Sequence, residues 1–427
     1  MIESKKLLNS VLAVTALAYG AAAHAACPAG TEKVGNVDGK LACALKGRYT
    51  QDLVLSSNNV YVLQGGVFIG NDNKNNSTLT IQAGTKVMGE SGRDFLVITR
   101  GSKINANGTK QKPIVMTTAK QSGRTRGSWG GLIINGNAPI NSCPEGAGIC
   151  EAEGEGGTGV YGGNQANDNS GVLRYVVVEF AGYEITPENE LNGIAFQGVG
   201  SGTKVEYIQV HMNADDGVEF FGGTVNVKYV YLTGNKDDSL DWTSGWKGKA
   251  QFVVIKQYDD QGNNGIEADN LGKNHGATPR SQPTISNVTL VGQSGAALKG
   301  GDGMLLRAGT GAKIYNSIVT GFKKACISVQ DAGDLDGIDF QNNIINCGVN
   351  FSSSFDLEGD FLARKGNRMA NPMLKDLVPS EKSPALDPVE MPGEIFDDLF
   401  FEEVNFVGAI KSSDKDWTKG WTTEAKN

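Results

Sequence analysis

Short runs of alternating apolar and polar residues fill the middle of the chain and return at a nearly constant spacing. Val218 begins one such run, Leu240 begins the next 22 residues later, and Ile266 follows after 26 more. Alternation with a period of two indicates β-strands, and Gly, Asn and Asp residues between the runs indicate turns. Several strands in a repeat of about 22 residues predict one coil of a parallel β-helix, in which each coil buries its apolar side chains against its neighbours.

The repeat sets the predicted organisation of the chain. Residues 26–60 are expected to form an N-terminal cap held by a disulfide, and residues 61–350 the β-helix itself. Gly-rich or Pro-rich stretches at 142–170 and 271–283 break the repeat and are interpreted as loop insertions. Residues 351–427 are expected to be a C-terminal capping segment, because the last coil of a solenoid has an open edge.

Two further features belong to this solenoid. Asn287, Asn316 and Asn342 recur at the same point of later coils and predict a ladder of side-chain amides hydrogen-bonded along the stack. Trp417 and Trp421 are expected to plug the end of the solenoid.

The N-terminus has the pattern of an export signal. Two lysines precede a mostly apolar run over residues 7–23, and Ala-His-Ala at 23–25 is typical of a cleavage site. We therefore predict that residues 1–25 are a signal peptide. A retained membrane anchor and a lipoprotein modified at Cys27 are the alternatives.

The cysteines agree with export. All six lie outside the predicted signal, and none forms the C-x-x-C spacing of a zinc site. The sequence cannot fix their pairing, but neighbours pair most simply. The expected disulfides are Cys27 with Cys43, Cys143 with Cys150, and Cys326 with Cys347.

Charge and hydropathy exclude several classes of protein. The 427 residues contain 39 Lys or Arg and 47 Asp or Glu, a formal net charge of −8. Nucleic-acid binding is not expected, because it requires cations that neutralise phosphates. Beyond the N-terminus no apolar stretch is long enough to span a bilayer, so the mature chain is expected to lack a transmembrane span.

Several longer motifs resemble a known group of proteins. They are LTIQAGTKVMGE (79–90), GSKINANGTKQKPIVMTT (101–118), SWGGLIINGNAPIN (128–141), ADDGVEFFGGTVNVKYV (214–230), NPMLKDLVPSEKSPALDP (371–388) and FVGAIKSSDKDWTKGWT (406–422). The chain resembles exported bacterial β-helix proteins of the pectate-lyase-like superfamily, a largely uncharacterised group often labelled lipoprotein or multidrug transporter. The resemblance implies an all-β fold, a single right-handed parallel β-helix, and no established activity.

One position of successive coils carries carboxylates. Glu219, Asp241 and Glu267 each fall three residues after Asp216, Asp238 or Asn264. Stacked strands lie about 4.8 Å apart, where like charges repel by about 1 kcal/mol in water and roughly 3–4 kcal/mol at a half-buried surface. Such a row favours binding of a hard cation, and we predict Ca²⁺. The alternative is that these acids are solvated or accept backbone N–H groups in turns. The expected ligands are Asp216, Glu219, Asp238, Asp241, Glu267 and Asp269.

Basic and aromatic residues near these acids suggest further roles. Arg307 and Lys299 are candidate catalytic residues, because a Ca²⁺-assisted lyase needs a base near its bound uronate. The alternative for Arg307 is that it offsets the charge of the acids. Tyr231, Trp246 and Tyr258 are expected on the exposed face beside the acids, where their rings would stack on a sugar.

Three functions are consistent with the sequence. The first is an exported protein at the cell surface, outer membrane or outside the cell, which binds or organises polysaccharide or other surface components without catalysis and with Ca²⁺ support. The second is a Ca²⁺-assisted polysaccharide lyase. The third is a self-assembling surface-layer or filament subunit.

Overall fold

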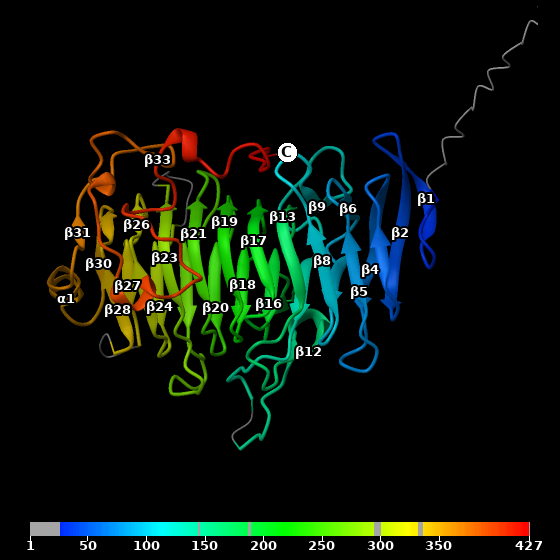
Figure 1. Ribbon diagram of the computed structural model, residues 1–427, viewed down its shortest axis with the longest axis horizontal. Coiled ribbons are helices and arrows are strands. Elements are labelled where there is room, and N and C mark those ends of the chain that lie inside the picture. The colour runs from blue at the N-terminus through cyan, green and yellow to red at the C-terminus, as the bar shows by residue number, and fades with distance from the viewer. Residues whose placement is uncertain (1–25, 144–145, 187–188, 294–299, 332–335, 427) are drawn as a thin grey trace, which may run out of the picture.

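The computed structural model describes residues 26–143, 146–186, 189–293, 300–331 and 336–426. The predicted signal peptide, residues 1–25, lies outside the described residues, as does Lys299. Strands stack side by side along one long axis, from β2 (Lys40–Tyr49) near the N-terminus to β31 (Arg368–Met369) at the opposite end (Figure 1).

The stack is a single 27-stranded sheet that winds into coils. Among the described residues, β1 (Glu32–Val37) and β2 are its antiparallel pair, and the other pairings within it are parallel. The chain is therefore a right-handed parallel β-helix, as predicted. Each coil has three faces, defined here by the strands that pair along the axis.

The first face contains the second half of β4 (Asn59–Ile69) and the strands β7 (Phe95–Ile98), β10 (Gly131–Asn135), β16 (Ile194–Gln197), β18 (Val218–Phe221), β20 (Leu240–Thr243), β22 (Ile266–Asp269), β24 (Met304–Arg307), β27 (Ile327–Val329) and β30 (Phe351–Ser352). The second face contains β3 (Leu53–Leu55), β5 (Thr78–Ile81), β8 (Lys103–Asn107), β25 (Ala312–Tyr315), β28 (Ile338–Gln341) and the first halves of β13 (Gly171–Glu179), β17 (Lys204–His211), β19 (Asn226–Thr233), β21 (Lys249–Lys256) and β23 (Thr284–Val291). The third face contains the first halves of β2 and β4, the strands β6 (Lys86–Gly89), β9 (Ile114–Thr118), β26 (Ile318–Thr320), β29 (Ile344–Asn346) and β31, and the second halves of β13 to β23.

Smaller elements lie outside these faces. They are the strand pairs β11 (Ala152–Gly154) with β12 (Gly159–Tyr161), β14 (Glu184–Thr186) with β15 (Asn189–Glu190), and β32 (Leu374–Lys375) with β33 (Val378–Pro379); the helices α1 (Leu357–Ala363) and α2 (Gly393–Phe396); and the 3-10 turns η1 (Glu155–Gly157), η2 (Pro384–Leu386) and η3 (Ser413–Lys415).

The core forms by stacking like residues from coil to coil. Val218 pairs with Leu240, which pairs with Ile266, in the register that the repeat predicts. Two residues further along the same strands, Phe220 pairs with Trp242, and both side chains are fully buried. Because inward positions are apolar in coil after coil, the core is one continuous column rather than a sphere.

A second periodic feature marks the corner between the second and third faces. The corner residue of each coil from β13 to β28 has a positive φ, between 48° and 59°, although none is glycine. A left-handed residue with a side chain costs about 1–2 kcal/mol, which Asn tolerates best. Four coils place aromatic rings there instead, and ring stacking of about 0.5–1.5 kcal/mol per pair offsets that cost. The corner residues are Tyr175, Tyr207, Tyr229, Phe252, Asn287, Asn316 and Asn342.

The predicted amide ladder is therefore confirmed only in part. The Asn342 amide donates to Asn316 Oδ1 at 3.0 Å, but the Asn287 amide donates to the carbonyls of Phe406 and Gly408 in the C-terminal segment. The sequence pattern located the asparagines and missed the aromatic half of the same row.

The solenoid extends past both of its predicted boundaries, 61 and 350. Parallel pairing begins within β2 and ends at β31. The last coil is closed by α1, whose Leu357 and Phe361 are buried in the main core. The Phe361 ring lies 5.2 Å from that of Phe351 in β30.

The C-terminal segment also differs from its predicted role as an end plug. It runs back along the side of the solenoid, so that Trp421 contacts Tyr175 and Tyr207, and Trp417 contacts Tyr229. The side-chain amide of Gln251 exchanges two hydrogen bonds with the backbone of Glu402. These contacts depend on residues more than 100 positions apart, which no local pattern reveals.

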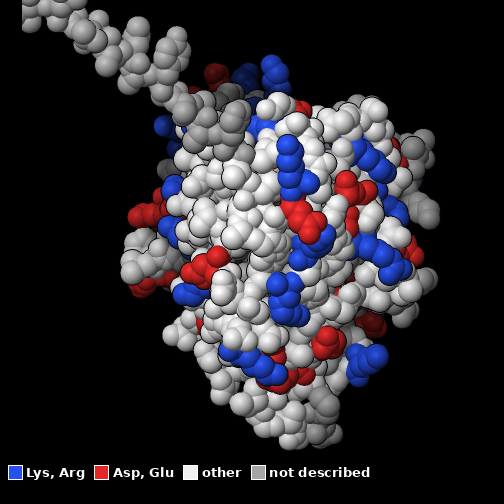
Figure 2. Space-filling view, turned by 90° about the vertical axis from the view of Figure 1, so that its right-hand side faces the viewer, with Lys and Arg blue, Asp and Glu red and all other residues white. Residues whose placement is uncertain are grey.

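The N-terminal end of the solenoid carries interspersed charges of both signs (Figure 2). Lys46 pairs with Glu32 at 2.8 Å and Lys86 with Asp38 at 2.6 Å. The antiparallel strand β1 covers part of β2. Charged side chains and a covering hairpin are typical of sheet edges protected against pairing with another chain.

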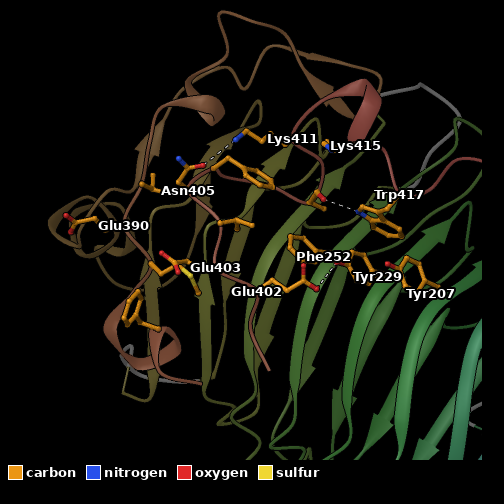
Figure 3. A pocket seen from close by; sticks show the side chains of 16 residues that line it. Tyr207, Tyr229, Phe252, Glu390, Glu402, Glu403, Asn405, Lys411, Lys415 and Trp417 are labelled. Atoms are coloured by element: carbon orange, nitrogen blue, oxygen red, sulfur yellow. Dashed lines mark hydrogen bonds between the residues drawn. The ribbon is translucent and has the colours of Figure 1, made fainter. Parts of the chain in front are cut away.

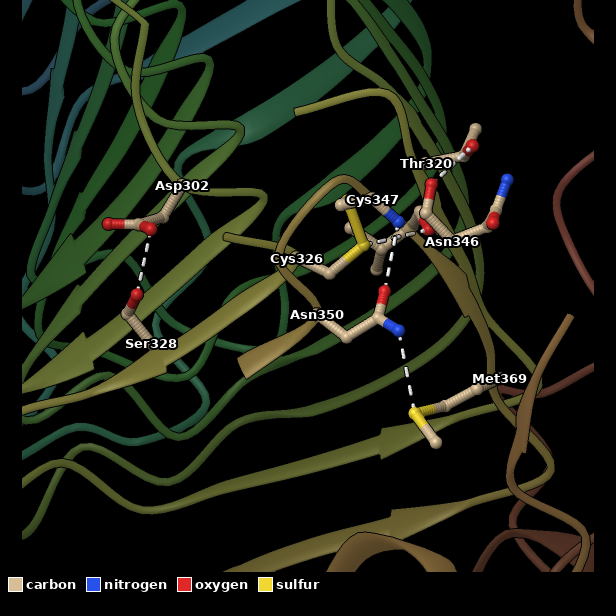
Figure 4. The surroundings of a disulfide bond; sticks show 9 residues. Asp302, Thr320, Cys326, Ser328, Asn346, Cys347, Asn350 and Met369 are labelled. Carbon is tan, nitrogen blue, oxygen red and sulfur yellow. Dashed lines mark hydrogen bonds between the residues drawn. A yellow bond between two sulfur atoms is a disulfide. The ribbon is translucent and has the colours of Figure 1, made fainter. Parts of the chain in front are cut away.

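The three predicted disulfides are confirmed. Cys27 is bonded to Cys43, Cys143 to Cys150, and Cys326 to Cys347. The last of these joins the start of β27 to the turn before β30, one coil further along (Figure 4). It therefore ties two adjacent coils near the C-terminal end.

Replacing both Cys326 and Cys347 by serine is expected to lower the free energy of unfolding by about 3 kcal/mol, because the bond closes a loop of about 21 residues in the unfolded chain. Denaturant unfolding followed by circular dichroism measures the change. A double variant as stable as the wild type under oxidising conditions would contradict the expectation. Cys143 and Cys150, which close a loop in an insertion, provide the matched comparison, with a smaller expected loss.

Candidate functional site

The row of carboxylates lies on the first face. Glu219 in β18 pairs in register with Asp241 in β20, which pairs with Glu267 in β22. We call these three residues the acid file. The same outward position is occupied by Ala195 in the preceding strand and Leu305 in the following one, so the file is confined to three coils. The predicted register is confirmed, but the side chains are only partly exposed rather than open to solvent.

Turns before these strands bring further acids to the file. Asp216 Oδ1 accepts the backbone N–H of Asp238 at 3.0 Å, and Asp238 Oδ1 accepts that of Asn264 at 2.6 Å. Both aspartates are at least 93 % buried. One oxygen of each carboxylate thus accepts a backbone N–H from the next coil. This agrees with the alternative interpretation, in which the acids accept backbone N–H groups in turns.

The carboxyl groups of this cluster lie close together, and each one disfavours ionisation of its neighbours. Oxygen atoms of Asp216, Asp238 and Asp241 lie within 4.8 Å of one another, and so do those of Asp215, Asp216 and Asp237. Burial, and then the neighbouring carboxylates, raise the pKa of Asp215 to about 8. The same causes hold the pKa values of Asp216, Glu219, Asp238 and Asp241 well above the usual carboxyl range.

Residues from the insertion at 142–170 complete the surroundings of the file. Glu155, in η1 between β11 and β12, is one of the charges that raise the pKa of Glu219. Its own pKa is raised to about 7, mainly by burial and then by Glu190. Tyr161, at the end of β12, is 5 % exposed and packs against Phe221. Sequence analysis missed Glu155 and Tyr161, because an insertion has no place in the repeat that would give its position.

Arg307 is the cation at the end of this cluster. Its guanidinium contacts Glu267 and bonds to Asp269 at 2.8 Å. These partners raise the pKa of Arg307 further above its ordinary value. The side chain therefore offsets the acids, as the alternative interpretation holds, and is poorly suited to accept a proton.

Several buried side-chain oxygens of the described residues have no hydrogen-bond partner, and two of them belong to this cluster. Asp241 Oδ1 is shielded from solvent, and so is Asn192 Oδ1, whose amide group donates to Glu219 at 2.5 Å. Asn192 is 97 % buried. Leaving such oxygens unpaired costs free energy, and hard cations bind carboxylate and amide oxygens. Asp241, Asp216 and Asp238 are therefore the residues whose oxygens could hold a cation at this place.

The predicted sugar-stacking residues require a correction. Trp246 is fully buried and stacks on Phe220 at 3.9 Å, inside the core. Tyr231 is covered by the C-terminal segment and bonds to Glu424, and Tyr258 is 6 % exposed beside His211. The prediction was wrong because the Trp246 ring packs in the core, and because the sequence does not show that a distant segment covers Tyr231.

Comparison with known proteins agrees with the β-helix fold described above. A stack of three-faced coils defines the chain as a parallel β-helix protein. The model of the pectate-lyase-like β-helix domain matches residues 47–383, and the chain belongs to this family. No curated protein matches the chain significantly, and no solved structure does. Among the described residues, none of the helices has the length and apolar character needed to cross a membrane.

Proposed function

We propose that this protein is an exported, non-catalytic β-helix protein that binds or organises polysaccharide at the cell surface, with Ca²⁺ at the acid file reinforcing the solenoid. The observation that carries the cation is Asp241 Oδ1, a buried oxygen without a hydrogen-bond partner among carboxylates from two adjacent coils. Export is supported by the signal pattern of residues 1–25 and by three disulfides, which persist in oxidising compartments. The polysaccharide partner is supported by the long side of the solenoid, since solenoids provide extended binding surfaces.

The two alternative functions have less support. A lyase needs a base beside the bound cation, and Arg307 is engaged by Glu267 and Asp269 with a pKa above its ordinary value. A filament needs ends that pair, and the N-terminal end carries the mixed charges and the covering hairpin described above. We therefore place Ca²⁺ in a stabilising role rather than a catalytic one.

Calorimetric titration of Ca²⁺ into the demetallated mature protein tests the cation. Saturable binding is expected for the wild type, and Asp241→Asn is expected to weaken it at least tenfold, because the variant keeps the shape of the side chain and removes one ligand charge. Glu358→Gln, at an exposed carboxylate of α1 far from the file, is the matched control and should bind like the wild type. Absence of saturable binding to the wild type would refute the cation site.

A further inference from the structure

A groove of about 910 Å³ separates the C-terminal segment from the corner between the second and third faces (Figure 3). Its volume lies in the range of sites for small ligands, about 300–1,000 Å³. The groove lies on another side of the coils from the acid file, because its floor is formed by corner residues and not by the first face. It contains none of the residues that were predicted to stack on sugars.

The floor of the groove is a fixed apolar strip. The rings of Tyr207 and Tyr229 stack at 4.3 Å and 6°, and those of Tyr229 and Phe252 at 5.0 Å and 18°. The repeat of the coils sets the spacing of these rings, of which Tyr207 and Tyr229 are partly exposed and Phe252 is 4 % exposed. Trp417 forms a wall, with its ring 5.4 Å from that of Tyr229 and tilted by 68°. Its indole N–H donates to the carbonyl of Ala409 at 3.0 Å, which holds the indole in place.

The rim of the groove is polar and carries both signs of charge. The Glu402 carboxylate accepts the Tyr229 hydroxyl at 2.8 Å and pairs with Lys228 at 3.2 Å. Lys411 donates to Asn405 at 3.5 Å, and Lys415 is exposed on the same rim. Donors and acceptors thus lie around the floor, and the carboxylates of Glu390, Glu402 and Glu403 outnumber the two lysines that line the groove.

We propose that this groove binds an uncharged glycan segment. A sugar ring combines apolar C–H surfaces with hydroxyls that both donate and accept, which matches an aromatic floor and a rim of mixed polarity. An anionic polymer would meet the carboxylates of Glu402 and Glu403 on a chain of net charge −8. The inference rests on the proposed function, and it adds the location of the polysaccharide site and the neutral character of the ligand.

Fluorescence and calorimetric titrations of the full mature chain test this site. The probes are neutral hexasaccharides of glucose and of xylose, with hexagalacturonate as the charged comparison, each in Ca²⁺ and in chelator. At least one neutral hexasaccharide is expected to bind and to change the tryptophan emission, a change that Trp417→Ala should abolish, while hexagalacturonate binds at least tenfold more weakly. Binding of hexagalacturonate alone, or of none of the probes, would overturn the inference.

Variants locate the binding. Trp417→Ala is expected to weaken it at least tenfold, and Lys415→Ala, which removes an exposed rim cation without touching the core, about threefold or more. Lys419→Ala, exposed on the same segment but outside the groove, should bind like the wild type. Unchanged binding in both groove variants would refute the site. Ca²⁺ binding that persists when no glycan binds would separate failure of this inference from failure of the cation site.

Discussion

In the presence of a calcium chelator, the folded protein is expected to melt at a higher temperature at pH 6.5 than at pH 8.5. The pKa of Asp215 is raised to about 8 and that of Glu155 to about 7, whereas carboxyls of an unfolded chain titrate near 4. The folded state therefore binds more protons than the unfolded state over this range. Stability from these protons is fully present below about pH 4 and is lost progressively as the pH rises to about 7 to 8.

Calcium is expected to reverse this dependence. It binds the deprotonated carboxylates and stabilises only the folded state, by about 2.7 kcal/mol at a hundredfold excess over Kd. Because protons compete for the same oxygens, the rise in melting temperature caused by Ca²⁺ should be largest at pH 8.5 and smaller at pH 6.5. Melting curves at the two pH values, with Ca²⁺ and with chelator, measure both effects.

One other buried group must be kept out of this measurement. Burial lowers the pKa of His211 to about 4, so its contribution to stability is lost as the pH falls below the ordinary histidine value of about 6.5. The chosen range begins at that value, and over it the contribution of His211 is small and opposite in sign to that of the carboxyls. Equal melting temperatures in all four conditions, after demetallation has been verified, would leave the acids as solvated turn residues with no cation to bind.

Trp246→Ala is expected to lower the free energy of unfolding by about 3–5 kcal/mol. The side chain is fully buried, stacks on Phe220, and donates its indole N–H to the carbonyl of Val225 at 3.1 Å. Alanine would leave a cavity between coils and an unpaired carbonyl. Denaturant unfolding followed by circular dichroism measures the loss, since the variant lacks a tryptophan that fluorescence would report.

The same experiment separates a core role from a surface role for this tryptophan. Phe396→Ala removes an aromatic ring that is 59 % exposed and should change stability by no more than about 0.5 kcal/mol. Trp246→Phe should lose less than the alanine variant, because the phenyl ring still stacks on Phe220. A loss below about 0.5 kcal/mol for Trp246→Ala would contradict the core position of this residue.

The acid file shows how far a repeat predicts a site. Glu219, Asp241 and Glu267 could be placed one above another because residues at one coil position must stack when the strands pair in parallel. Their burial could not be predicted, because Glu155 and Tyr161 come from an insertion that folds back from outside the repeat. The sequence did not decide whether Arg307 is a catalytic base or offsets the charge of the acids. Its contacts to Glu267 and Asp269 favour the second role.

The sequence by itself determined the solenoid and the stacking of its core, which depend on periodic apolar positions. It left the pairing of the cysteines open, and the structure confirmed the pairing of neighbours that lie one coil or less apart. Only the tertiary structure decided which outward-facing residues remain accessible. The C-terminal segment covers Tyr231, forms a wall of the groove with Trp417 and bonds to Gln251 far away in the chain. These contacts join an irregular segment to a repetitive surface. Many positions on that surface have similar local chemistry, so the sequence does not show which of them the segment covers.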